Sequence, residues 1–144
     1  MARVSIALPE TFAFATEVDV LIQHINRGNH LANENLIALL NEARMRYIDS
    51  LDFSQSDTDP RAFINADLAV IYKAEAKHRD RLKIEVAAND FNQYGCDIVY
   101  RVSRPADGQL IAIAKMAMLS FDYPNNCLKP VGENFPRLFS GKTA

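Results

Sequence analysis

NENLIALLNEARMRYIDSL, residues 33–51, is the stretch that decides the fold. Its apolar positions recur at intervals of three and four, which is typical of one stripe of an amphipathic α-helix. Asn33 suits the N-cap position, and Glu34 then lies in the first turn, where negative charge suits the helix dipole. The pattern predicts a helix of about five turns. Its stripe consists of Leu36, Ile37, Leu40, Ala43, Tyr47, Ile48 and Leu51.

Strand-like segments lie on both sides of this helix. A segment rich in Phe, Thr and Val, residues 12–22, predicts a first strand. After the polar loop SQSDTDP the sequence shows four more strand-like runs and no second helix. The turn signal ADG, residues 106–108, lies before the last run. The order predicts one α+β domain over residues 1–144, an antiparallel sheet wrapped around one long helix, which is the hotdog arrangement. The four runs are residues 62–77, 82–88, 96–102 and 109–123.

The last of these runs is apolar on both faces. One face carries Leu110, Ala112, Ala114 and Met116, and the other carries Ile111, Ile113, Ala117 and Leu119. A single helix covers only one face of an antiparallel sheet. The second face therefore predicts a partner, another copy of the chain, in a dimer or a dimer of dimers.

Composition narrows the class of protein. The chain has 144 residues, of which 49% are hydrophobic and 24% charged, as in a soluble globular domain. The net charge of −2 favours neither nucleic acid nor an anionic membrane as partner. There is no apolar run of the roughly 20 residues that a membrane span needs, and the N-terminal segment is too short for a signal peptide. Two isolated cysteines, Cys96 and Cys127, are expected to be reduced and structural, which fits a cytoplasmic protein.

The loop before the helix contains the polar residues that suggest a function. HINRGNHLAN, residues 24–33, followed by LIALLNEAR, resembles the motif of the 4-hydroxybenzoyl-CoA thioesterase-like branch of the hotdog superfamily. Residues 80–131 are similar to the strand meander of that family, so the resemblance covers about residues 12–136. It implies that the protein hydrolyses an acyl thioester without a cofactor. The acyl group would be attached to CoA or to an acyl carrier protein.

The resemblance also implies roles for three residues of this loop. The backbone N–H of Asn33, at the positive end of the helix dipole, would bind the thioester carbonyl oxygen. His30 would act as a base or hold a neighbouring amide, although a histidine here can also be a packed residue. Asn26 matches the acid of the family and would orient water or bind the carbonyl, or else serve only the turn of the loop.

Two further groups are candidates. Glu42 lies beside the apolar stripe and would activate water if half-buried, or would form an i,i+4 ion pair with Arg46. The basic segment KHRDR, with His78, Arg79 and Arg81, would meet the CoA phosphates or simply be solvated. His24, His30 and His78 have no metal-ligand spacing, so no metal is expected.

Two hypotheses about function remain open. Asn26 cannot attack a thioester as a carboxylate can, so a hydrolase of this kind would use water, activated by His30 or Glu42, and form no acyl-enzyme. The alternative is a hotdog protein that binds acyl thioesters without turning them over. Hydrolysis of a panel of acyl-CoAs, with an Asn26→Asp variant beside the native protein, separates the two.

Overall fold

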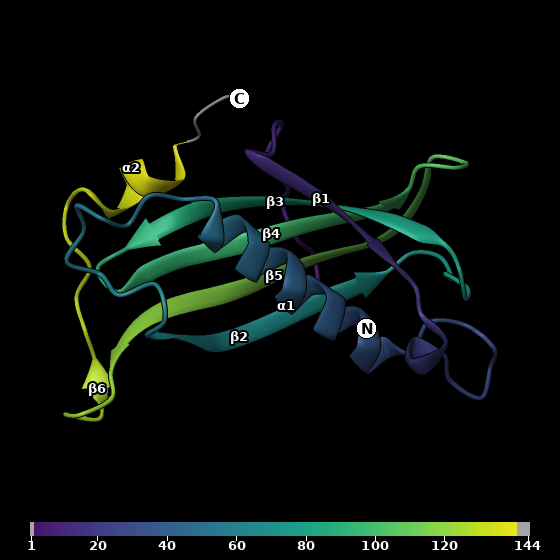
Figure 1. Cartoon of the computed structure of the whole chain (residues 1–144), viewed down its shortest axis with the longest axis horizontal. Coiled ribbons are helices and arrows are strands. Elements are labelled where there is room, and N and C mark those ends of the chain that lie inside the picture. Colours follow the sequence, from purple (N-terminus) through teal and green to yellow (C-terminus); the bar gives the residue numbers. More distant parts are fainter. Residues whose placement is uncertain (1, 141–144) are drawn as a thin grey trace.

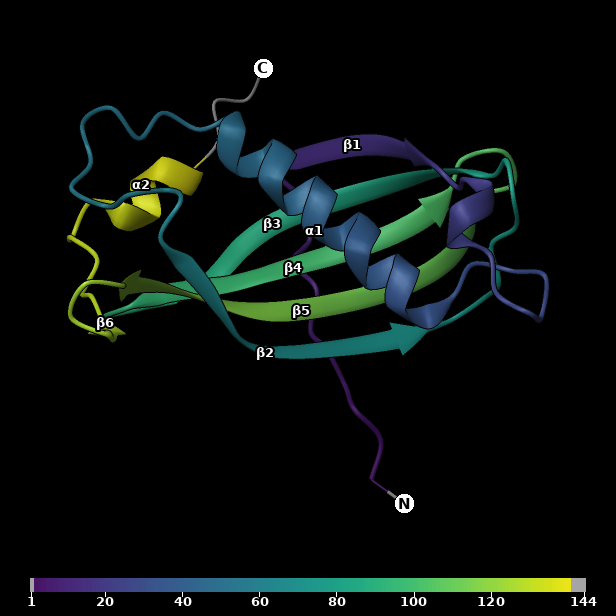
Figure 2. The same cartoon turned by 60° about the horizontal axis from the view of Figure 1, so that its bottom comes forward.

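The computed structural model describes residues 2–140. A six-stranded antiparallel sheet curves around one long helix, α1 (Asn33–Asp49), and the strand order is β1-β3-β4-β5-β2, with β6 on β5 (Figures 1 and 2). This arrangement confirms the predicted hotdog fold. The strands are β1 (Phe14–Asp19), β2 (Phe63–Tyr72), β3 (Arg81–Asn92), β4 (Gly95–Arg104), β5 (Gln109–Asp122) and β6 (Cys127–Leu128).

The apolar stripe of α1 packs into the concave face of the sheet. Leu36, Leu40, Ala43 and Tyr47 are at most 2% exposed and belong to one core with the inward-facing residues of β3, β4 and β5. The first residue of the helix is Asn33, so the N-cap is Ala32 and not Asn33 as predicted. Ala32 is buried, and its N–H donates to the carbonyl of His24, which holds it in an extended conformation at the N-cap position.

The two flanks of α1 face different edges of the sheet. On one flank, Nη1 of Arg46 donates to Oγ1 of Thr16 on β1, 2.8 Å away. On the other, Nη1 of Arg44 donates to Oδ1 of Asn65 on β2, 2.9 Å away. We call these the β1-facing flank and the β2-facing flank.

Short elements that periodicity does not reveal were missed by the sequence analysis. The prediction of no second helix is wrong, because α2 (Phe135–Phe139) follows the sheet. Five residues are too few to display a helical period, and α2 is stabilised instead by burial of Phe135 and Phe139. These two rings pack 5.1 Å apart, and Phe139 also contacts Tyr47 of α1, 5.8 Å away. The first predicted strand, residues 12–22, is shorter in the structure and ends at Asp19, and the 3₁₀ turn η1 (Ile22–His24) follows it.

The strand predicted over residues 62–77 ends at Tyr72. The N–H groups of Lys73 and Ala74 both donate to the carbonyl of Ile111, and the chain then leaves the sheet. Further on, the carbonyl of Ala76 accepts the N–H of Leu31 at 2.7 Å. The connection between β2 and β3 is thereby joined to the loop that precedes α1, which places these two segments side by side at the start of the helix.

The N-terminal segment crosses the sheet on the side away from α1 (Figure 2). Ile6 and Ala7 approach Val99 of β4, which is only 3% exposed although it points away from the helix. Beside them, Lys115 of β5 forms ion pairs with Asp67 and Asp97 at 2.9 and 3.2 Å. The convex face is thus partly covered within one chain. Within residues 2–140, no helix is long and apolar enough to cross a membrane.

Candidate functional site

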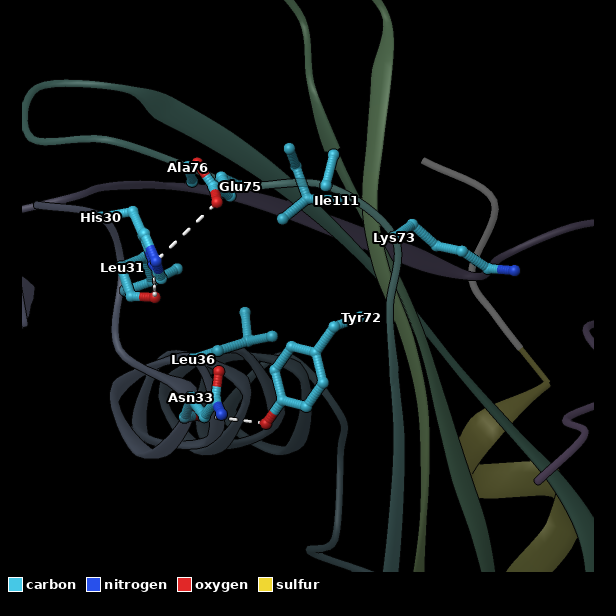
Figure 3. A pocket seen from close by; sticks show the side chains of 10 residues that line it. His30, Leu31, Asn33, Leu36, Tyr72, Lys73, Glu75, Ala76 and Ile111 are labelled. Atoms are coloured by element: carbon cyan, nitrogen blue, oxygen red, sulfur yellow. Dashed lines mark hydrogen bonds and ion pairs between the residues drawn. The ribbon is translucent and has the colours of Figure 1, made fainter. Parts of the chain in front are cut away.

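A cavity of about 250 Å³ lies at the N-terminal end of α1 (Figure 3). Its walls come from the loop before α1, the first turn of α1, the end of β2, the connection between β2 and β3, and β5. The sequence-predicted residues His30 and Asn33 are both in the wall, which is formed by His30, Leu31, Asn33, Leu36, Tyr72, Lys73, Ala74, Glu75, Ala76 and Ile111.

The start of α1 presents free hydrogen-bond donors at this cavity. Ala32 has no side chain that caps the helix, so the N–H groups of Asn33 and Glu34 have no acceptor within the described residues. The hydroxyl of Tyr72 donates to the carbonyl of Asn33 at 3.2 Å and ties this turn to the end of β2 (Figure 3). Free N–H groups at the positive end of a helix dipole stabilise negative charge on a bound oxygen.

His30 points into the same space. Its Nδ1 atom lies 3.3 Å from the carbonyl oxygen of Leu31, and its Nε2 atom lies 3.8 Å from Oε1 of Glu75 (Figure 3). A carbonyl only accepts hydrogen bonds, so the neutral ring that bonds to it carries its proton on Nδ1. Nε2 then holds the free lone pair, and the Glu75 carboxylate lies beside it.

Asn26 shapes the loop and does not line the cavity. Its Oδ1 atom accepts the N–H of Gly28 at 3.0 Å and that of His30 at 3.5 Å, and its own N–H donates to the His30 carbonyl at 3.0 Å. The ring of His30 lies against Gly28, where an added Cβ would be 2.9 Å from Nε2. Asn26 and Gly28 therefore fix the position of the imidazole.

The structure places Glu42 away from the cavity. Glu42 is on the β1-facing flank of α1 and forms the i,i+4 ion pair with Arg46, with Oε1 and Nε 3.1 Å apart. The cavity lies on the β2-facing flank, where Tyr72 contacts Asn33. The observed contact is the ion pair that the sequence analysis left open as the alternative for Glu42.

The basic turn KHRDR connects β2 to β3, as expected. His78 and Arg79 are exposed, whereas Arg81 pairs with Asp19 at 3.1 Å and with Glu17 at 3.7 Å. No cluster of three or more His, Cys, Asp or Glu residues suited to a metal ion occurs in residues 2–140.

Among the residues of the wall that sequence reasoning missed are the two that contact Asn33 and His30, namely Tyr72 and Glu75. Both fall inside the run predicted as one strand over residues 62–77, where a lone carboxylate is usually a solvated outer residue. The signal that would have found them is the pairing of the β2–β3 connection with the loop before α1, which depends on the long-range bond between Leu31 and Ala76.

Comparison with solved structures agrees with the fold. A 1,4-dihydroxy-2-naphthoyl-CoA thioesterase from Synechocystis matches with a TM-score of 0.77 and 17% identity over 91% of this chain and 98% of that one. A thioesterase from Thermus thermophilus, complexed with coenzyme A and Zn, gives 0.75 and 18% over 91% and 95%. A mutant 4-hydroxybenzoyl-CoA thioesterase complexed with 4-hydroxybenzoyl-CoA gives 0.73 and 15% over 88% and 97%.

Sequence comparison identifies the family. A search among curated proteins gives no match. The model of the thioesterase-like superfamily matches residues 20–137, which include the loop, α1 and the main part of the sheet. This match and the neighbouring folds support thioester hydrolysis and indicate a thioesterase, as the sequence analysis predicted. The chain belongs to the thioesterase-like superfamily.

Proposed function

We propose that the protein hydrolyses acyl-CoA thioesters in the cavity at the start of α1. One observation carries the proposal: the free N–H of Asn33, the Nε2 atom of His30 and the carboxylate of Glu75 surround a single cavity of about 250 Å³. Thioester hydrolysis needs a donor for the carbonyl oxygen and a base for the attacking water, and these residues supply both.

In the proposed reaction the thioester carbonyl oxygen accepts the N–H of Asn33. His30 takes a proton from water through Nε2 as the water oxygen bonds to the carbonyl carbon, and Glu75 stabilises the imidazolium. The tetrahedral intermediate then expels the thiolate as the C–S bond breaks, and the imidazolium returns its proton to the sulfur. Water is the nucleophile in this proposal, because the oxygen of Asn26 is engaged with the loop and Glu75 pairs with His30, and the proposed reaction therefore has no acyl-enzyme.

The exposed His78 and Arg79 are the proposed contacts of the CoA phosphates, because their turn belongs to the same connection as Glu75. Arg81, which already pairs with Asp19, would contribute less. CoA as the carrier of the acyl group is supported by two structural neighbours that hold CoA or a CoA thioester.

The proposed assembly is a dimer or a dimer of dimers. Ile113, Ala117 and Leu119 of β5 remain partly exposed on the convex face beyond the N-terminal segment, which leaves apolar surface for a second copy. A cytoplasmic location is proposed from the net charge of −2 and the two free thiols.

A panel of acyl-CoAs tests the activity, with release of the CoA thiol as the signal. The rival function, binding without turnover, is favoured by Asn26 at the position of the family acid. Asp at this position would accept the same two backbone bonds, so Asn26→Asp keeps the loop and adds only a charge. We expect the native protein to hydrolyse at least one substrate. Hydrolysis by the variant alone would establish the rival function.

A further inference from the structure

The first turn of α1 is held without a capping side chain. Helices usually begin with Ser, Thr, Asp or Asn at the N-cap, where the side-chain oxygen accepts the N–H of the second or third helical residue. Here the N-cap is Ala32, which is 1% exposed and has no such oxygen. The N–H groups of Asn33 and Glu34 therefore stay free, but a first turn without a cap is prone to fraying.

Two hydrogen bonds from side chains fix this turn instead. The side-chain amide of Asn35 donates to the carbonyl of His24 at 3.1 Å, which ties the turn to the preceding loop. The hydroxyl of Tyr72 donates to the carbonyl of Asn33 at 3.2 Å, which ties the turn to the end of β2 (Figure 3). Both bonds have a carbonyl as acceptor, so neither of them occupies an N–H group of the first turn.

Tyr72 combines this contact with a place in the cavity wall. Its side chain lines the cavity, and its hydroxyl reaches Asn33, which lines the same cavity. Partial burial of the phenol, and the negative charge of Glu34, raise the pKa of Tyr72, so the hydroxyl keeps its proton and remains a donor. Tyr72 thus stabilises the start of the helix in a way that leaves the N–H of Asn33 available to a ligand.

We propose that Tyr72 is a positioning residue for thioester hydrolysis, and that its hydroxyl holds Asn33 so that the backbone N–H stays directed at the carbonyl oxygen of the substrate. The inference rests on the proposed function, because it takes Asn33 as the donor to that oxygen. The oxygen carries a negative charge in the tetrahedral intermediate and not in the bound thioester. The orientation of the N–H therefore matters more for kcat than for KM.

The first test is Tyr72→Phe, which removes the hydroxyl and keeps the ring. Loss of an oxyanion donor costs about a hundredfold or more in kcat, and here the donor itself remains, so we expect a loss of about tenfold, with KM changed by less than about twofold. The melting temperature should stay close to the native value, because Tyr72 is 46% exposed. Steady-state kinetics and thermal unfolding measure these quantities.

Tyr123→Phe is the matched control. Tyr123 is 60% exposed and follows the end of β5, whereas the cavity touches Ile111 near the start of that strand, so the control should keep the native kcat and KM. If the native protein hydrolyses the substrate and Tyr72→Phe has the same kcat, the inference is overturned and the proposed function stands. A lower kcat accompanied by a higher KM and a lower melting temperature would assign the hydroxyl a structural role and also overturn the inference.

A binding experiment tests the inference without turnover. The carboxylate of a free acid product places negative charge at the oxyanion position, and the primary amide of the same acid is a neutral analogue of the same shape. By calorimetry, Tyr72→Phe should bind the carboxylate about fivefold more weakly than the native protein does and bind the amide equally well. Equal changes for both ligands, or no binding of the carboxylate to the native protein, would overturn the inference, even if no acyl-CoA is hydrolysed and the proposed function fails.

Discussion

The Nε2 atom of His30 lies 3.8 Å from Oε1 of Glu75, and the two residues come from separate connections of the fold. The bond between the Leu31 N–H and the Ala76 carbonyl brings those connections together. A base that becomes positively charged during the reaction therefore has a carboxylate beside it. This pairing makes the role of Glu75 testable.

Glu75→Gln should lower kcat by about fivefold and leave KM nearly unchanged. The variant keeps the shape of the side chain but loses the charge that stabilises the imidazolium. The effect is modest because the Glu75 side chain is 68% exposed and solvent screens the pair. Steady-state kinetics on one acyl-CoA measures it. An unchanged kcat would remove Glu75 from the mechanism.

Gly28→Ala should reduce activity far more than stability. The new Cβ would lie 2.9 Å from Nε2 of His30 and 3.3 Å from Oδ1 of Asn26, so the imidazole must move. Gly132→Ala is the matched control, because no heavy atom lies within 4 Å of its added Cβ. Kinetics and thermal unfolding of both variants check this expectation. Equal activity in the two would show that the position of His30 does not matter.

Stability should fall on acidification because of Asp67. Its hydrogen bond from Lys115, and a second from the N–H of Ala117, lower the pKa of its carboxyl. A carboxyl whose pKa is lower in the folded state stabilises the fold above its unfolded pKa of about 3.9, and this stabilisation is lost as pH falls through the folded value.

Urea unfolding followed below about pH 4 measures this loss, and Asp67→Asn is expected to flatten the decline. The same decline in the native protein and in the variant would show that other carboxylates cause it.

The two cysteines should differ in reactivity. Burial, and the charge of Asp97, raise the pKa of Cys96 to about 12, so its thiol stays protonated and inaccessible. Cys127 is exposed. A thiol reagent should label one cysteine in the native protein and both in denaturant, and Cys127→Ser should abolish native labelling. Rapid labelling of native Cys127→Ser would contradict the buried position of Cys96. The same variant suits assays that detect the CoA thiol.

The fold was predictable where the sequence has a clear period. The stripe of α1, the alternation in β3 and β4, and the long apolar run of β5 indicated the element types and the hotdog arrangement. The helix α2 was not predictable, because it is too short to show a helical period. Tertiary contacts that bury Phe135 and Phe139 stabilise it instead.

The lining of the candidate site was predictable only where it is local in sequence. His30 and Asn33 lie at the junction of a polar loop and a helix, which a sequence displays directly. Long-range hydrogen bonds bring Glu75 and Tyr72 to the same cavity. Neither the secondary-structure propensity nor the spacing of residues in the sequence predicts such bonds. For Glu42, the position beside the apolar stripe did not reveal which edge of the sheet the side chain faces. Its ion pair with Arg46 could therefore not be separated from a place in the site.

The rate of CoA release by the native protein and by His30→Ala, each given the best substrate of the acyl-CoA panel, tests the central claim most directly. General-base catalysis by His30 predicts a loss in kcat of about a hundredfold or more in the variant, with little change in its melting temperature, because the side chain is partly exposed at 29%. An unchanged kcat in His30→Ala would contradict the account.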